Sequence, residues 1–219
     1  QDGADELALL AVAAPSGADQ IFTGGATWAD VPNMTGDIYL AAVSDLAITF
    51  SAETYATGGK RIFVRAQVDG GTASPSDEIL VVGDYVGVRS FTFVVRNVQP
   101  GARNVKIQAY VDSAGGNGHI ADRTLKVVGA RVNQSIHAGH LFVAAPSGPD
   151  VTTASQAWSD VPDLSGSMYV PVLGGLAVTF TAEINASGAG RIFARALLDG
   201  TPLENVKAYF ETAHKYGKY

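Results

Sequence analysis

The sequence contains no cysteine, which excludes disulfide bonds, thiol catalysis and zinc sites built from thiolates. It also has no apolar run close to the ~20 residues that a membrane-spanning helix requires. Charged residues are scarce at 16%, and 21 acidic residues outnumber 15 basic residues without any basic cluster. Nucleic acid is therefore not an expected partner, because the positive patch that binds phosphates is missing.

Catalytic signatures are absent as well. The chain has no GxSxG, no phosphate-binding P-loop and no GxGxxG, and its acidic residues are scattered rather than paired. The loop DSAGGNGHIAD at 112–122 has residue types found in calcium sites, but it lacks the alternating oxygen ligands of an EF-hand. The sequence predicts a protein that is not an enzyme and holds no cofactor, with calcium at this loop as the alternative to a simple turn.

An internal repeat is the main positive feature. The stretch LAITFSAETYATGGKRIFVRAQVDG at 46–70 recurs as LAVTFTAEINASGAGRIFARALLDG at 176–200, and residues 28–70 match residues 158–200 at 21 of 43 positions. The chain therefore carries two copies of one module. We expect a first domain over 1–131, a linker over 132–140 and a second domain over 141–219.

Apolar and polar residues alternate within the repeat, as Leu46, Ile48, Phe50 and Ala52 do with their neighbours, and the same holds from Ile62 to Val68. A period of two buries one face of a strand, so these runs predict two strands, joined at Gly58-Gly59 as a hairpin. With 25 glycines and 47% hydrophobic residues, the composition favours an all-β protein built from two tandem β-sandwich, jelly-roll-like domains. We expect Trp28 to be a bulky core residue of the first domain.

The second copy ends early. Tyr219 corresponds approximately to Arg89, so the strands predicted near 90–95, 104–111 and 123–128 have no counterpart in it. Three explanations remain open: strands from a neighbouring chain complete it, the chain is a piece of a longer repeat array, or the second domain is rearranged. The N-terminal run LALLAVAA is either a donor strand or the first strand of its own domain.

Some polar and aromatic residues recur in both copies. A functional interpretation places Glu53 with Arg65 in a ligand groove, whereas a structural interpretation makes them an ion pair across adjacent strands. The predicted structural ion-pair positions are Glu53, Arg61 and Arg65, with Glu183, Arg191 and Arg195 in the second copy. The recurring tyrosines Tyr39 and Tyr169 are the candidate ligand or interface aromatics.

Several motifs carry a resemblance: Trp-x-Asp-Val-Pro, Ile-Thr-Phe-Ser-Ala-Glu, Arg-Ile-Phe-Val-Arg-Ala, Asp-Gly, Ser-Phe-Thr-Phe and Val-Lys-Ile-Gln. Over about residues 9–128 the sequence resembles tandem β-sandwich modules of bacterial or phage surface and fibre proteins. The resemblance implies an extracellular, cell-surface or virion-surface structural protein, whose partners are other copies of itself or further repeats. The alternative is a carbohydrate-binding adhesion module for surface glycans.

Overall fold

A computed structural model describes residues 8–14, 19–76, 78–84, 86–112, 114–132, 137–138, 142–143, 151–154, 157–169, 178–182, 191–203 and 208–211. The chain divides into two compact units, Gln1–Gly174 and Gly175–Tyr219. The predicted domain and linker boundaries stay predictions, since most residues around them lie outside the described ranges. Within the described residues no helix has the length and apolar character needed to cross a membrane.

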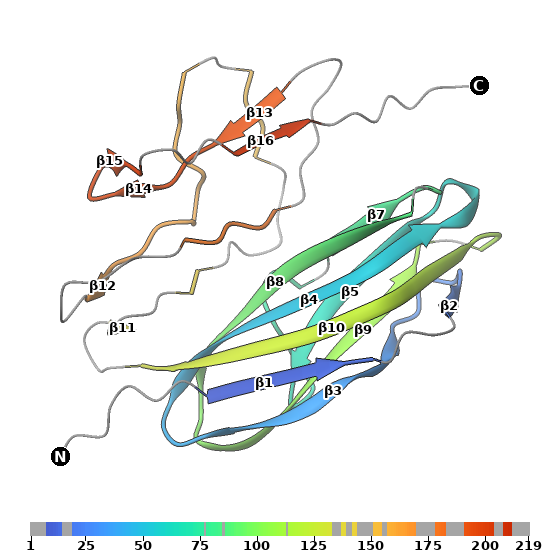
Figure 1. Ribbon diagram of the computed structural model, residues 1–219, viewed down its shortest axis with the longest axis horizontal. Helices are drawn as coiled ribbons and strands as arrows, with labels where there is room; N and C mark the ends of the chain where they lie inside the picture. Colours follow the sequence, from blue (N-terminus) through green and yellow to red (C-terminus); the bar gives the residue numbers. More distant parts are fainter. Residues whose placement is uncertain are drawn as a thin grey trace. The chain divides into compact units, whose positions relative to one another are not determined.

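The first unit is a sandwich of two antiparallel sheets (Figure 1). The first, which we call the β4 sheet, has the order β1-β10-β4-β8, with β2 also paired to β10; the second, the β5 sheet, has the order β3-β9-β5-β6, with β7 also paired to β5. The strands of the β4 sheet are β1 (Ala8–Ala13), β2 (Gln20–Thr23), β4 (Ser44–Ala56), β8 (Gly87–Val98) and β10 (Asn117–Arg131). Those of the β5 sheet are β3 (Ala29–Leu40), β5 (Arg61–Val68), β6 (Gly71–Thr72), β7 (Glu78–Val82) and β9 (Gly101–Val111).

The first unit also contains a two-residue parallel pair, β11 (His137–Ala138) with β12 (Met168–Tyr169). In the second unit, β13 (Arg191–Ala194) pairs with β16 (Ala208–Glu211), and β14 (Leu197–Leu198) pairs with β15 (Thr201–Pro202). The only helical segment among the described residues is the single turn η1 (Thr57–Gly59). The all-β, sandwich fold class predicted from the sequence is confirmed.

Alternation explains how the strands build the core. On β4, Leu46, Ile48, Phe50 and Ala52 are fully buried between the sheets, as are Ile62, Val64 and Ala66 on β5. The residues between them point to the outer faces, as a period of two requires. β1 adds Leu10 and Val12 to the core and pairs with β10 of the same unit, so the N-terminal run is this unit's own strand.

The predicted hairpin between β4 and β5 is wrong. β4 pairs with β10 and β8, whereas β5 pairs with β9, β6 and β7, so the two strands lie in opposite sheets. The connection η1 turns the chain from one sheet to the other, with Gly58 and Gly59 at φ values of 68° and 67°. These left-handed conformations suit glycine. They allow an arch, a connection between two sheets, as readily as they would allow a hairpin turn within one sheet.

The two copies of the repeat share the backbone geometry of one turn. In the first copy, Asp69 and Gly70 have φ values of 48° and 84°, and they close a two-residue turn in which Val68 pairs with Gly71. In the second copy, Asp199 and Gly200 have φ values of 48° and 78°, and Leu198 pairs with Thr201. Two central residues with positive φ define a type I′ turn, which Asp-Gly favours. The same Asp-Gly turn is therefore present in both copies.

The two copies differ in burial. Ile48 and Phe50 are 0% exposed, whereas the residues that match them in the second copy, Val178 and Phe180, are 54% and 40% exposed. In the first copy, β10 and β8 flank this part of β4, with Leu125 and Phe91 opposite Phe50. The apolar face that the repeat preserves is therefore enclosed in one copy and open to solvent at these two residues in the other.

This difference predicts unequal effects of the same substitution. Phe50→Ala should destabilise the first unit by about 3–5 kcal/mol, because it removes a fully buried ring from a packed core. Phe180→Ala should change stability by only about 0.5 kcal/mol, as is usual for an exposed position. Urea unfolding of both variants, followed by circular dichroism, measures the two losses, and equal losses would contradict the burial seen here.

Candidate functional site

The outer face of the β5 sheet gathers aromatic and charged side chains from three strands and the residue before β3. We call this group the aromatic face; it consists of Trp28, Asp30, Phe63, Arg65, Lys106, Gln108 and Tyr110. β9 lies between β3 and β5, so it brings residues that are far apart in sequence side by side. Phe63 is directly opposite Tyr110, and Arg65 is opposite Gln108.

The rings pack on one another. The centroids of Phe63 and Tyr110 are 4.7 Å apart with an interplanar angle of 1°, so these rings are stacked. Trp28 meets Tyr110 edge to face, with centroids 4.5 Å apart and planes at 85°. Each such contact contributes about 0.5–1.5 kcal/mol beyond area burial. All three rings are half-buried, so they form a partly exposed apolar surface.

Arg65 lies over the indole of Trp28, with its Cζ 4.3 Å from the ring centroid. Its Nε and Nη2 donate hydrogen bonds to Gln108 Oε1 at 2.9 and 2.6 Å. Gln108 Nε2 in turn donates to Asp30 Oδ1 at 2.6 Å, so the amide is oriented from both sides. This chain of hydrogen bonds holds the guanidinium over the ring, a position that arginine adopts readily.

Asp30 also accepts from Lys106, whose Nζ lies 3.0 Å from Oδ1. Hydrogen bonds from Gln108 and Lys106 lower the pKa of Asp30 below its usual value. Among the described residues, no carboxylate forms an ion pair with Arg65. The aromatic face thus carries two cations, Arg65 and Lys106, and one carboxylate.

A second pair that contains a cation lies at the start of β5. Arg61 Nε donates to Asp112 Oδ2 at 2.8 Å, and its Cζ lies 5.2 Å from the centroid of Phe63. Burial raises the pKa of Asp112, but the hydrogen bonds from the Arg61 side chain and backbone outweigh it, so the pKa is lowered overall. Asp112 belongs to the loop considered for calcium, and its carboxylate is engaged by arginine. Within the described residues, no group of three or more histidine or acidic side chains is arranged to hold a metal ion.

Asp69, in the turn after β5, is the third carboxylate whose pKa is lowered. Its Oδ1 accepts the backbone N–H of Asn104 at 2.9 Å, and Arg103 Nη1 lies 3.0 Å from Oδ2. The backbone hydrogen bond and then the arginine lower the pKa of Asp69. These interactions connect the turn to β9, the strand that pairs with β5.

The structure separates some residues that the sequence grouped. Glu53 lies on β4, opposite Ala121, whereas Arg65 lies on β5, so they face outward from opposite sheets and form no pair. Tyr39 is 72% exposed at the far end of β3, opposite Ala102 and away from the aromatic face. Tyr169 has only its backbone described, in β12, and its contribution to a ligand surface stays a prediction.

The second-copy residues are described only in part. Glu183 lies outside the described residues. Arg191 is placed in β13 by its backbone, and Arg195 follows that strand with an exposed side chain. Their assignment as ion-pair positions stays a prediction.

Trp28 is the main correction to the predicted core. It is half-buried on the outer face instead of filling the interior, because Val31 is the inward residue of this segment and Trp28 shares its face with Asp30, Arg65 and Tyr110. Nothing in the sequence selects Gln108, and Tyr110, one of the tyrosines considered for a sugar-stacking surface, is set aside there because it has no repeat counterpart. A usable signal was present: the outward residues Trp28, Phe63 and Arg65 recur as Trp158, Phe193 and Arg195.

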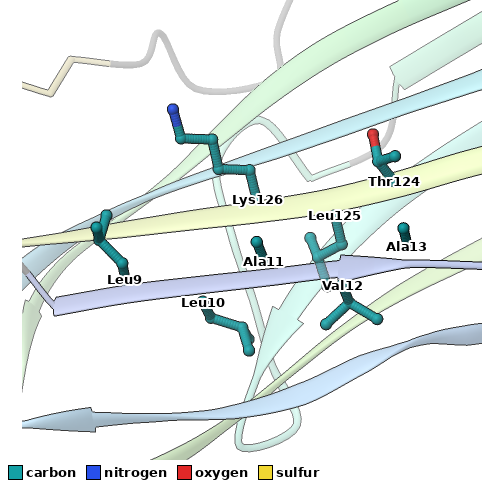
Figure 2. Close-up of a pocket in the computed structure, with 8 residues that line it drawn as sticks. All are labelled: Leu9, Leu10, Ala11, Val12, Ala13, Thr124, Leu125 and Lys126. Carbon is teal, nitrogen blue, oxygen red and sulfur yellow. The ribbon is translucent and has the colours of Figure 1, made fainter.

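A separate depression of about 300 Å³ lies along β1 and β10 (Figure 2). Its lining is apolar except for Thr124 and Lys126. Leu10 and Val12 project to one side of β1 in this view, while Leu9 and Ala11 project to the other. A catalytic or ligand site needs several convergent polar groups, which this depression does not offer.

No family model matches this chain. No curated protein matches it either. Among solved structures it is similar to the VP2 subviral particle of infectious bursal disease virus, with 12% identity over 58% of this chain and a TM-score of 0.43. The chain spans only 34% of that protein's length.

Two carbohydrate-binding modules are also similar. One is the CBM36-1 domain of a multidomain xylanase from the hindgut metagenome of Trinervitermes trinervoides, with 16% identity, a TM-score of 0.32, and coverage of 57% of this chain and 99% of that one. The other is a CBM36 module in complex with calcium and xylotriose, with 12% identity, a TM-score of 0.32, and coverage of 54% and 98%. These similarities are too low for a shared function to follow.

The perturbed carboxylates predict how stability depends on pH. A folded-state pKa below the unfolded value of about 3.9 gives stability that is present above that pH and is lost as the pH falls toward the folded pKa. Asp30, Asp69 and Asp112 all have lowered pKa values. The free energy of unfolding of the first unit should therefore fall as the pH drops below about 4.

The variant Asp30→Asn/Asp69→Asn/Asp112→Asn should flatten this acid dependence. It should also cost less than about 1 kcal/mol per site at neutral pH, because the pairs are partly solvated. Urea titrations between pH 3 and 7 measure both effects. If the free energy of unfolding of the variant fell with decreasing pH as steeply as that of the unsubstituted chain, other groups would be responsible for the acid dependence.

Proposed function

We propose that this chain is a non-catalytic, extracellular structural module of a repeat-built surface appendage, fibre or filament, and that its modules associate by strand complementation. The observation that carries the proposal is the recurrence of one module, in sequence and in turn geometry, with unequal burial in the two copies. Repetition of a rigid β-module supplies reach and repeated contacts without needing a catalytic site.

The unequal burial suggests how modules associate. Covering an exposed side chain such as Val178 or Phe180 contributes about 1.5–3 kcal/mol. In the first copy the corresponding residues are covered partly by β8 and β10, which pair on either side of β4. Strands of the same pattern from a neighbouring chain would cover the second copy by β-strand addition, and repeated head-to-tail addition gives a filament.

The assembly proposal is tested on the whole chain. Light scattering over a range of concentrations should give masses above the 22.7 kDa of one chain, and electron microscopy should show extended particles. Val178→Glu should lower the mass toward one chain, because it places a charge on the face to be covered. Thr179→Glu, on the adjacent residue, is the matched control and should leave the mass unchanged.

A monomer at every concentration, with a second copy that unfolds cooperatively, would contradict strand complementation. The structural role would then rest on the tandem arrangement alone.

A second candidate function is adhesion to surface glycans. The aromatic face favours it, because half-exposed rings beside fixed hydrogen-bonding groups are suited to ligands that are apolar on one side and polar on the other. Tyr39, the residue for which the sequence suggested this role, lies apart from that cluster.

A further inference from the structure

We propose that the aromatic face binds an acidic saccharide, with the guanidinium of Arg65 recognising the sugar carboxylate beside Trp28. This inference rests on glycan adhesion, the second function proposed above, and it names the ligand class and the recognising group.

The hydrogen bonds to Gln108 use only part of the donor capacity of Arg65. A guanidinium has five N–H donors and no acceptor. Arg65 uses its Nε and one Nη2 hydrogen on Gln108 Oε1, which leaves both Nη1 hydrogens and one on Nη2. Two neighbouring nitrogens with donors remaining match the two oxygens of a carboxylate in a bidentate pair, the strong form of this interaction.

Arg65 is also held in position by its neighbours before any ligand binds. Asp30 orients the Gln108 amide, Gln108 fixes Arg65, and the indole of Trp28 supports the guanidinium from below. A side chain already held in one position loses little conformational freedom on binding, so more of the interaction energy is available for affinity. Asp30 is neutralised by Lys106, which leaves the charge of Arg65 to attract an anion.

The charge of the aromatic face favours an anionic ligand. The aromatic face contains two cations, Arg65 and Lys106, and one carboxylate, whereas the whole chain has a net charge of −6. The local excess of positive charge therefore differs in sign from the rest of the protein. Electrostatic complementarity then favours a ligand that carries carboxylates.

The aromatic rings beside Arg65 favour a sugar over an acidic peptide. Trp28, Phe63 and Tyr110 provide a half-exposed apolar surface next to the cation. A uronic acid places a carboxylate on the rim of a ring whose C–H groups pack against aromatic side chains, so one residue satisfies both halves of the site. An acidic peptide chain offers the charge without the ring.

The recurrence of the outward residues supports a role beyond folding. On β5 the outward residues Arg61, Phe63 and Arg65 are identical in the second copy, although the outward Gln67 becomes leucine; of the inward residues, Ile62 and Ala66 are identical and Val64 becomes alanine. Packing constrains inward residues more than outward ones. Identity at these three outward positions therefore points to a role on the outer face in addition to packing.

The test compares polygalacturonate with the same polymer after methyl esterification, which removes the charge and keeps the ring. Calorimetric titration of the whole chain should show binding of the acid form and weaker binding of the ester. Arg65→Gln should weaken binding of the acid form on the order of tenfold, the loss expected for a charge-assisted hydrogen bond. Arg65→Lys should give an intermediate loss because it keeps the charge but not the bidentate geometry.

Two control variants define the site. Tyr39→Ala removes an exposed aromatic at the other end of β3, and Arg103→Gln removes a half-buried cation from another part of the β5 sheet. Neither should alter affinity by more than about twofold, since neither touches the aromatic face. Circular dichroism of each variant confirms that it is folded.

The outcomes are distinct. Equal binding of the acid and ester forms would overturn recognition by Arg65 while leaving glycan adhesion intact. Absence of binding to either polymer would overturn both. Binding of polyglutamate that is as tight and as dependent on Arg65 would show that the ligand class is an acidic peptide instead of a saccharide.

Discussion

The pairing of β4 with β10 on one side and β8 on the other is the constraint on which the first unit depends. It places Leu46, Ile48, Phe50 and Ala52 in a row that is fully buried between the sheets. These side chains leave water only when both flanking strands and the opposite sheet are present. The exposure of Val178 and Phe180 shows the same sequence pattern without that enclosure.

The outer face follows from the inner one. Because β9 packs Ile107 and Ala109 inward, its alternate residues Lys106, Gln108 and Tyr110 must point outward. Its place between β3 and β5 then brings the Gln108 amide between Asp30 and Arg65. The geometry of the aromatic face is therefore a consequence of strand order, and a different neighbour for β5 would leave Arg65 without its support.

The sequence predicted the strands well and their partners less well. Alternation is a local property, so the inward residues of β4 and β5 could be read directly from the pattern. The choice of strand partners depends on residues far apart in the sequence. Gly58 and Gly59 permit either a hairpin within one sheet or an arch between two sheets, and the arch forms because it buries the apolar faces of both sheets. The separation of Glu53 from Arg65 follows from that choice, since an arch sends the outward residues of its two strands to opposite sides of the sandwich.

The error over Trp28 has a similar physical origin. A large aromatic residue in an apolar sequence is usually expected inside, and size alone does not show which face of the strand it occupies. Here its recurrence together with Asp30, Phe63 and Arg65 was the better guide, because these residues share one outer surface in the folded unit. In an internal repeat, identity at inward positions reports the demands of packing. Identity at outward positions is not explained by that demand, and in the first unit two such residues, Trp28 and Arg65, contact each other on the outer face.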